Sequence, residues 1–172
     1  SELGLDLARA LRVATSGRPG PVHISLPANV LESSVQTTGD LVPRPGDFRG
    51  PTDPLNDQVA ERVLDALADA SKPLVLTGPA MMRGAGPGLL SRLAQRAHVP
   101  AVCMESPRGI NDPSLGAFAE VLPEADLIVL LGKKLDFTLR FGEEPAISPQ
   151  CRFIHLDPEA AVLDQTRRAL SD

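Results

Sequence analysis

The chain has 172 residues, a net charge of −5 and a hydrophobic share of 42%, which suits one domain of ordinary size with a core of its own. The acidic balance argues against a nucleic-acid surface. Its longest apolar runs are too short to span a bilayer. No secretory signal pattern is visible, and Cys103 and Cys151 are isolated, so we expect reduced thiols in a cytoplasmic protein with no nucleic-acid or membrane partner.

The first 54 residues carry three different patterns. Residues 3–16 have apolar side chains at three- and four-residue steps, which predicts a helix ending at Gly17. Residues 22–26 form an apolar run after glycine and proline, which predicts a buried strand. Because a lone strand cannot pair its backbone groups, we expect its partner strands to come from a larger protein or from another copy. Residues 32–54 are rich in proline and glycine, which predicts a linker without regular elements.

From residue 55 onward, apolar runs alternate with helical patterns. The apolar runs predict strands at 74–77, 99–104, 127–131 and 153–156, and the helical patterns cover 55–70, 86–97, 117–122 and 159–170. Strands that are apolar at nearly every position are covered on both faces, and their alternation with helices indicates parallel βαβ units. The sequence therefore predicts an α/β fold. We expect an open, doubly wound, mostly parallel sheet of Rossmann-like form, with helices on both faces.

Ligands of such sheets bind beyond the carboxyl ends of the strands, where three predicted loops carry our candidate residues. The candidates are Gly78, Pro79, Ala80 and Arg83 after the first strand, Gly132, Lys133, Lys134 and Asp136 after the third, and Asp157 after the fourth. The glycines would permit close approach of a phosphate, the lysines would pair with a diphosphate, and Asp157 would accept hydrogen bonds from a ribose.

Each candidate also has a structural interpretation. The first loop is a turn that the fold itself needs, and the basic pair is a solvated loop. Asp157 equally suits a helix cap, with Pro158 at the first helical position. The three histidines lack metal-ligand spacing, and His155 is expected to be a hydrogen-bonded core residue. No nucleophile–base pair stands out, so we expect neither a catalytic residue nor a metal site in this chain.

Several short segments together carry a family resemblance. They are Gly-Arg-Pro-Gly-Pro-Val at 17–22, Lys-Pro-Leu-Val-Leu-Thr-Gly at 72–78, Val-Pro-Ala-Val at 99–102, Ala-Asp-Leu-Ile-Val-Leu-Leu-Gly at 125–132 and Phe-Ile-His-Leu-Asp-Pro at 153–158. In this order they resemble thiamine-diphosphate-dependent enzymes of the acetolactate synthase-like family. Each segment alone is weak evidence for the family, but the ordered set covers most of the chain.

The resemblance implies a division into three parts. Residues 1–31 would be the last helix and strand of a truncated pyrimidine-binding domain, and residues 32–54 a Pro/Gly-rich linker. Residues 55–172 would be the central domain, of the DHS-like NAD/FAD-binding type, truncated at its C-terminal end. The parent would make or break carbon–carbon bonds next to a carbonyl of 2-keto acids or acyl donors, using thiamine diphosphate and magnesium. The family's motifs for both lie outside this sequence, so the chain alone would not be catalytic.

The resemblance also implies ligands and partners. In this family the central domain scaffolds the catalytic domains and binds FAD, binds an ADP-containing nucleotide, or is empty. The implied partners are the pyrimidine-binding and diphosphate-binding domains of the same parent chain, and other copies in a homo-oligomer. Two other interpretations stay open. One is a free-standing nucleotide- or flavin-binding module, and the other is a vestigial structural domain without a ligand.

Overall fold

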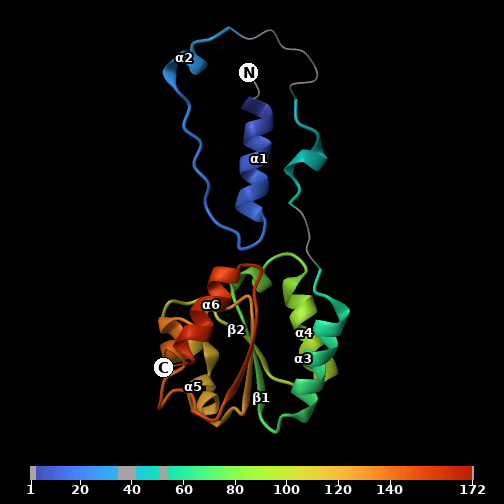
Figure 1. The fold of residues 1–172 in the computed structure, drawn as a ribbon, viewed down its shortest axis with the longest axis vertical. Coiled ribbons are helices and arrows are strands. Elements are labelled where there is room, and N and C mark those ends of the chain that lie inside the picture. Colours follow the sequence, from blue (N-terminus) through green and yellow to red (C-terminus); the bar gives the residue numbers. More distant parts are fainter. Residues whose placement is uncertain (1–2, 35–41, 51–53, 172) are drawn as a thin grey trace. The chain divides into compact units, whose positions relative to one another are not determined.

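The computed structural model describes residues 3–34, 42–50 and 54–171. The chain divides into two compact units, Ser1–Pro54 and Leu55–Asp172, which are drawn in Figure 1. Across the described ranges, no helix is both long enough and apolar enough to cross a membrane. The assignment of the two units to parts of a larger enzyme stays a prediction.

The first unit is built around one amphipathic helix. Helix α1 (Leu3–Thr15) is followed by the short α2 (Ala28–Leu31) and the 3-10 turn η2 (Pro45–Phe48). The guanidinium of Arg12 donates to the carbonyl of Asp47 over 3.5 Å, which joins α1 to η2. The predicted first helix is therefore confirmed, with its end one residue earlier than expected.

Two expectations for this unit are wrong. Residues 22–26 form no strand, and Val22 and Leu26 are exposed. The apolar pattern suits a strand, but no other strand of the described residues lies beside it to pair with its backbone. The segment 32–54 is not wholly irregular either, because it contains η2. Pro45 fits the first turn position there, and the Asp47 carboxylate accepts from the Arg44 N–H over 2.8 Å.

The second unit alternates helices and strands. Its main elements are α3 (Asp57–Asp69), β1 (Pro73–Thr77), α4 (Gly86–Ala97), β2 (Ala101–Cys103), α5 (Phe118–Val121), β3 (Leu127–Leu131), β4 (Arg152–Leu156) and α6 (Ala160–Ala169). The four strands form one sheet in the order β2-β1-β3-β4, and every neighbouring pair is parallel. The predicted α/β class and the four strands of this unit are confirmed.

Alternate strand residues face opposite layers, as a sheet covered on both sides requires. Leu74 and Leu76 of β1 belong to one buried cluster, with Phe118 and Leu122. Val75 belongs to the other, with Leu67 of α3. Figure 1 shows α3 and α4 on one side of the sheet and α5 and α6 on the other. The doubly wound arrangement explains why β1 and β3 are apolar at nearly every position.

Strand β2 is shorter than the sequence pattern predicts, since residues 99–100 and Met104 lie outside it. Pro100 has no N–H to donate to a ladder, but its carbonyl still accepts from the Val75 N–H over 2.9 Å. After β2 the chain runs through short turns, η4 (Gly109–Asn111) and η5 (Pro113–Leu115), before α5. These turns form part of the carboxyl edge described below.

The core makes a direct stability prediction. Leu130 of β3 is completely buried, whereas Leu89 on α4 is about half exposed. We expect Leu130→Ala to lower the free energy of unfolding by about 2 to 5 kcal/mol, because it leaves a cavity in a packed core. Leu89→Ala is the matched control, with an effect within about 0.5 kcal/mol. Urea denaturation followed by circular dichroism measures both, and equal losses would contradict the assigned core.

Candidate functional site

The strand order places a crevice at one defined point of the sheet. From β1 the chain moves to β2 on one side, and β3 then lies on the other side of β1. In open parallel sheets this reversal opens a crevice at the carboxyl ends of the two strands. The loops that follow β1 and β3 begin at Gly78 and Gly132, so the candidates of these two loops lie at the carboxyl ends of neighbouring strands. Their contact with a ligand stays a prediction.

Gly78 and Gly132 bring the two loops into direct backbone contact. A Cβ atom at residue 78 would lie only 2.7 Å from the Gly132 carbonyl oxygen, which is closer than real Cβ contacts. Gly132 itself has a φ of 65°, in the left-handed region that favours glycine. The thiol of Cys103, at the end of β2, donates to the Gly78 carbonyl over 3.3 Å. Three strand ends therefore meet at residue 78.

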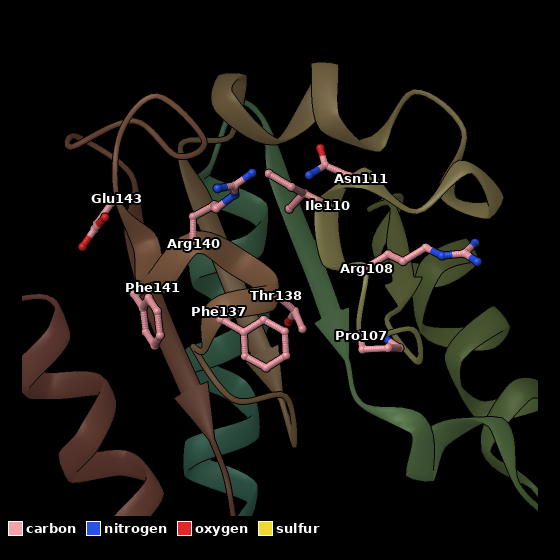
Figure 2. A pocket seen from close by; sticks show the side chains of 9 residues that line it. All are labelled: Pro107, Arg108, Ile110, Asn111, Phe137, Thr138, Arg140, Phe141 and Glu143. Atoms are coloured by element: carbon pink, nitrogen blue, oxygen red, sulfur yellow. The ribbon is translucent and has the colours of Figure 1, made fainter.

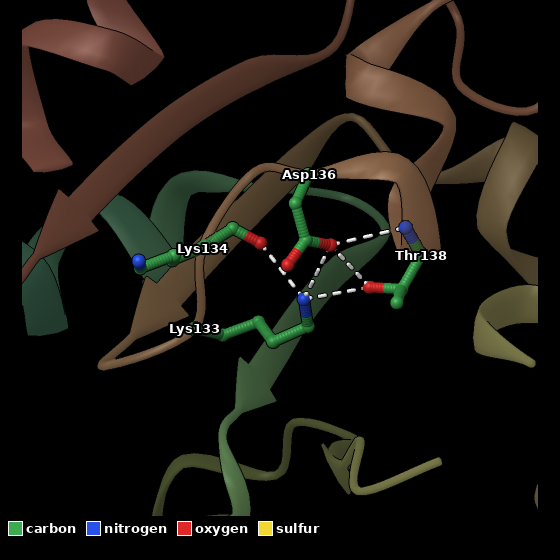
Figure 3. Close-up of polar contacts among 4 residues, drawn as sticks. All are labelled: Lys133, Lys134, Asp136 and Thr138. Atoms are coloured by element: carbon green, nitrogen blue, oxygen red, sulfur yellow. Dashed lines mark hydrogen bonds and ion pairs between the residues drawn. The ribbon is translucent and has the colours of Figure 1, made fainter. Parts of the chain in front are cut away.

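Lys133 is a buried cation that organises the loop after β3 (Figure 3). Its side chain is 7% exposed. Its Nζ donates to the Lys134 carbonyl over 2.8 Å, to Asp136 Oδ1 over 3.0 Å and to Thr138 Oγ1 over 2.7 Å. The Thr138 hydroxyl and N–H both donate to Asp136 Oδ1. We call Lys133, Asp136 and Thr138 the lysine cluster.

The lysine cluster keeps Asp136 ionised. Burial by itself raises the pKa of this carboxyl, but the hydrogen bonds from Thr138 and Lys133 outweigh burial and hold the pKa below its ordinary value. Asp136 is also the N-cap of η7 (Phe137–Gly142), where its side chain accepts from the Thr138 N–H over 3.0 Å. One carboxylate thus neutralises a buried ammonium and starts the next turn.

The other predicted residues of these two loops are more accessible. Lys134 is partly exposed, and its ammonium points away from the lysine cluster in Figure 3. Pro79 and Ala80 begin the turn η3 (Pro79–Met82) and are exposed, as is Arg83 directly after it. The lysine pair therefore divides into one buried residue that shapes the loop and one that is available to a ligand. Contact of any of these residues with a nucleotide stays a prediction.

Asp157 follows β4 and has a side chain that is 0% exposed. Its Oδ1 accepts from the Glu159 N–H over 3.0 Å, and its Oδ2 lies 3.9 Å from His155 Nε2. His155 Nδ1 lies 2.9 Å from the hydroxyl of the buried Thr166, so its predicted role as a hydrogen-bonded core residue is confirmed. The alternative that Pro158 takes the first helical position is wrong, because α6 starts at Ala160 with Glu159 as N-cap.

A cavity of about 460 Å³ lies beside this crevice, between η4 and η7. We call it the Phe137 cavity, and Figure 2 shows all the side chains that line it. The sequence prediction named none of its lining residues as site residues. Arg140 and Phe141 in its wall have φ of 52° and 53°. The sequence does not predict these two positive φ angles. Bulky residues rarely adopt the left-handed region, where glycine or asparagine would be expected.

A second cavity, of about 430 Å³, lies at the carboxyl end of β2 and is lined by Met82, Cys103 and Asp112 among others. Cys103 and Cys151 are both free thiols, and burial raises the pKa of each, to about 11 for Cys151. High pKa values are typical of structural rather than reactive thiols. In the part of the chain that the structure describes, no group of three or more metal-ligating side chains comes together.

The fold and the strand order define an open parallel α/β domain with a topological switch point between β1 and β3. The model of the family "Thiamine pyrophosphate enzyme, central domain" matches residues 60–171, which is most of the chain. The chain belongs to this family, and the predicted resemblance is confirmed.

Three relatives with assigned names align along nearly the whole chain. Oxalyl-CoA decarboxylase of Escherichia coli K12 is 31% identical over 96% of this chain and 30% of its own length. The acetolactate synthase large subunit of Parasynechococcus marenigrum is 29% identical over 98% of this chain and 29% of its own. Acetolactate synthase of Mycobacterium bovis is 32% identical over 95% of this chain and 28% of its own. The chain thus spans under a third of each relative.

A solved structure has the same fold. The thiamine diphosphate-dependent 4-hydroxybenzoylformate decarboxylase of Rhodococcus jostii RHA1 aligns with a TM-score of 0.58 and 17% identity. The alignment covers 95% of this chain and 32% of that one. At this level of identity the likeness concerns the fold alone.

The lysine cluster yields a pH-dependent prediction. We expect Asp136→Asn to lower the free energy of unfolding by about 2 kcal/mol at pH 7, because Lys133 and Thr138 lose a charged acceptor. The pKa of Asp136 is lowered by folding, so its contribution is present above the unfolded pKa, about 3.9. It is lost as the pH falls through the folded value. The deficit of the variant should therefore shrink below about pH 4.

Urea denaturation at a series of pH values measures this deficit. Asp164→Asn is the control, because Asp164 pairs with Arg167 on an exposed helix surface and its loss should cost under about 1 kcal/mol. A deficit for Asp136→Asn that stays constant down to pH 3 would show that the ionised carboxylate is not its source.

Proposed function

We propose that this chain is the central domain of a thiamine-diphosphate enzyme of the acetolactate synthase-like family, and that its switch-point crevice binds FAD or another ADP-containing nucleotide. The parent enzyme makes or breaks a carbon–carbon bond next to the carbonyl of a 2-keto acid or an acyl donor. The observation that carries the proposal is the family match over residues 60–171. The names of the aligned relatives, oxalyl-CoA decarboxylase and acetolactate synthase, support this type of reaction.

The geometry of the crevice supports a nucleotide. The loops after β1 and β3 meet at two glycines, which brings the backbones of both loops together at the strand ends, where ligands of open parallel sheets bind. Lys134 carries an ammonium that points away from the lysine cluster, and an ammonium is a suitable partner for that diphosphate. Asp157 stands at the end of β4, but its side chain is 0% exposed and accepts from the Glu159 N–H, so it supports the loop and adds no evidence for a ribose contact. The name oxalyl-CoA decarboxylase adds a further ADP-containing compound, coenzyme A, to the candidates.

In this proposal the domain acts as a scaffold and performs no chemistry by itself. Its partners are the pyrimidine-binding and diphosphate-binding domains of the same parent chain, in a homo-oligomeric, cytoplasmic enzyme that uses thiamine diphosphate and magnesium. The crevice residues of this chain bind and orient the nucleotide and exclude water from it. Their described polar contacts hold a loop in place and include no paired nucleophile and base.

One observation favours a second candidate, a structural domain whose crevice is empty. Lys133, one of the two lysines predicted to meet a diphosphate, is buried and already donates to Lys134, Asp136 and Thr138. A cation used in this way stabilises the loop whether or not a ligand is present. The two candidates therefore differ in a single measurable property, namely nucleotide binding.

A ligand panel distinguishes the two candidates. The chain lacks tryptophan and tyrosine, so its unfolding should be followed by circular dichroism or calorimetry. FAD, ADP, ATP, coenzyme A, NAD and thiamine diphosphate are added separately at about 100 times a trial dissociation constant. A bound ligand should raise the melting temperature by roughly 5 to 10 °C. No shift with any adenine nucleotide would favour the empty scaffold, and a shift with thiamine diphosphate alone would contradict the proposed division of ligands between domains.

Substitution of Lys134 tests where the nucleotide binds. We expect Lys134→Gln to raise the dissociation constant of the nucleotide about tenfold or more, because a charge-assisted bond to phosphate is lost. Lys72→Gln is the matched control, since Lys72 pairs with Glu124 at the opposite edge of the sheet. Lys133 is unsuitable for this test because its loss would disturb the loop itself. Calorimetry that gives one dissociation constant for all three proteins would exclude Lys134 as a contact.

A further inference from the structure

The Phe137 cavity contains none of the nucleotide contacts proposed above, yet it has the chemistry of a binding site. We propose that this cavity binds a planar organic anion. The flat, conjugated body of the ligand packs against Phe137 and the apolar wall made by Pro107 and Ile110, and its carboxylate or phosphate pairs with Arg140. The cavity volume of about 460 Å³ lies in the range of small-molecule sites, about 300 to 1,000 Å³. This inference goes beyond the proposed nucleotide crevice and does not require it.

Arg140 supplies the charge. In Figure 2 its guanidinium reaches from η7 toward Ile110 and Asn111 across the cavity. Of the ion pairs in the described part of the chain, none involves Arg140 or Arg108. The one acidic lining residue, Glu143, points away from Arg140 in the same view. A guanidinium without a carboxylate partner, in a protein of net charge −5, is a specific site for a bidentate anion.

Two aromatic rings supply the apolar part. Phe137 is 60% exposed and Phe141 is 45% exposed, although phenylalanine is among the residues most often buried. Aromatic residues make up only 3% of the chain, so two at one cavity are a local concentration. A flat ligand that covers Phe137 removes apolar surface from water and can stack on the ring. Together with Arg140, the ring selects for molecules that are both planar and anionic.

The backbone of η7 is strained where these side chains emerge. Arg140 and Phe141 have φ of 52° and 53°, and only the next residue, Gly142, is one that adopts positive φ without cost. Residues in this region cluster at binding sites, where the surrounding structure holds them in place. Glycine or asparagine at position 140 would relieve the strain, but neither would place a guanidinium in the cavity.

The two walls of the cavity are held together in advance of binding. Gly109 in η4 has a φ of 60°, and a Cβ there would overlap the backbone carbonyl of Thr138 in η7. Thr138 in turn belongs to the lysine cluster. The wall that carries Phe137 and Arg140 is therefore fixed by a buried charge, and the opposite wall is fixed by a glycine contact. Such preorganisation lowers the entropy cost of binding.

The experiment uses four probes that separate the contribution of a planar ring from the contribution of an anionic group. Benzoate and phenyl phosphate carry a ring and an anion, benzamide carries only a ring, and inorganic phosphate carries only an anion. Titration of the ¹⁵N-labelled chain should give saturable shifts of amide signals from residues 107–111 and 137–143 with the first two probes. Benzamide and inorganic phosphate should bind at least tenfold more weakly. The stronger of the first two probes then identifies a carboxylate or a phosphate as the preferred anion.

Variants test the assigned residues. Arg140→Gln should weaken benzoate and phenyl phosphate at least tenfold, and Arg92→Gln, on the exposed surface of α4, should change nothing. Arg140→Gly should abolish binding and also raise the melting temperature by about 2 to 4 °C, since it relieves a strained backbone. A merely structural Arg140 would not give loss of binding together with a gain in stability. Phe137→Ala is a second variant that should also abolish binding, in case Arg140→Gln fails to fold.

Three results would overturn the proposal. One is equal binding of benzamide and benzoate, another is unchanged affinity of Arg140→Gln, and the third is shifts that map to residues 78–83 instead. The outcome is separable from that of the nucleotide proposal. Lys134→Gln should alter binding of ADP without altering binding of benzoate, and Arg140→Gln should do the reverse.

Discussion

The arrangement of this domain depends on how closely its two central strands approach at their carboxyl ends. Strands β1 and β3 stay in register up to Thr77 and Leu131, and the next residue on each strand is a glycine. At residue 78 there is no room for a side chain, because the Gly132 carbonyl occupies that space. The two loops therefore leave the sheet from one shared point. The crevice and the lysine cluster are built on the loops that diverge from it, and the Phe137 cavity lies between the loop after β3 and η4 of the loop after β2.

The second unit could be predicted in detail because its strands are buried on both faces. Strand β3 is apolar at all five positions and is followed by glycine, and its predicted and observed bounds coincide. The run at residues 22–26 has a similar pattern but forms no strand. An apolar pattern reports that a segment could pair, and it carries no information on whether a partner strand is present. Backbone pairing is a property of two segments, so a single segment predicts it poorly.

The candidate site shows the same division between local pattern and tertiary context. The meeting of the candidate residues could be predicted, because parallel strands bring Gly78, Gly132 and Asp157 to one edge of the sheet. Ligand binding at that edge stays a prediction. The different roles of Lys133 and Lys134 could not be predicted from the sequence. Two adjacent residues of the same type differ only in the direction in which the loop points their side chains. The left-handed backbone conformation of Arg140 could not be predicted from the sequence either, because packing around η7 imposes it against the residue's own preference.

The lysine cluster restricts which substitutions this sequence can accept during evolution. Replacement of Lys133 alone leaves the Asp136 carboxylate without its cation, and replacement of Asp136 alone leaves a buried ammonium without its anion. Breaking a buried pair on one side costs far more than replacing both members by residues that pack well. Changes at positions 133 and 136 are therefore strongly epistatic, and position 138 is coupled to both. Homologues should vary at these three positions together, while the neighbouring Lys134 varies independently of them.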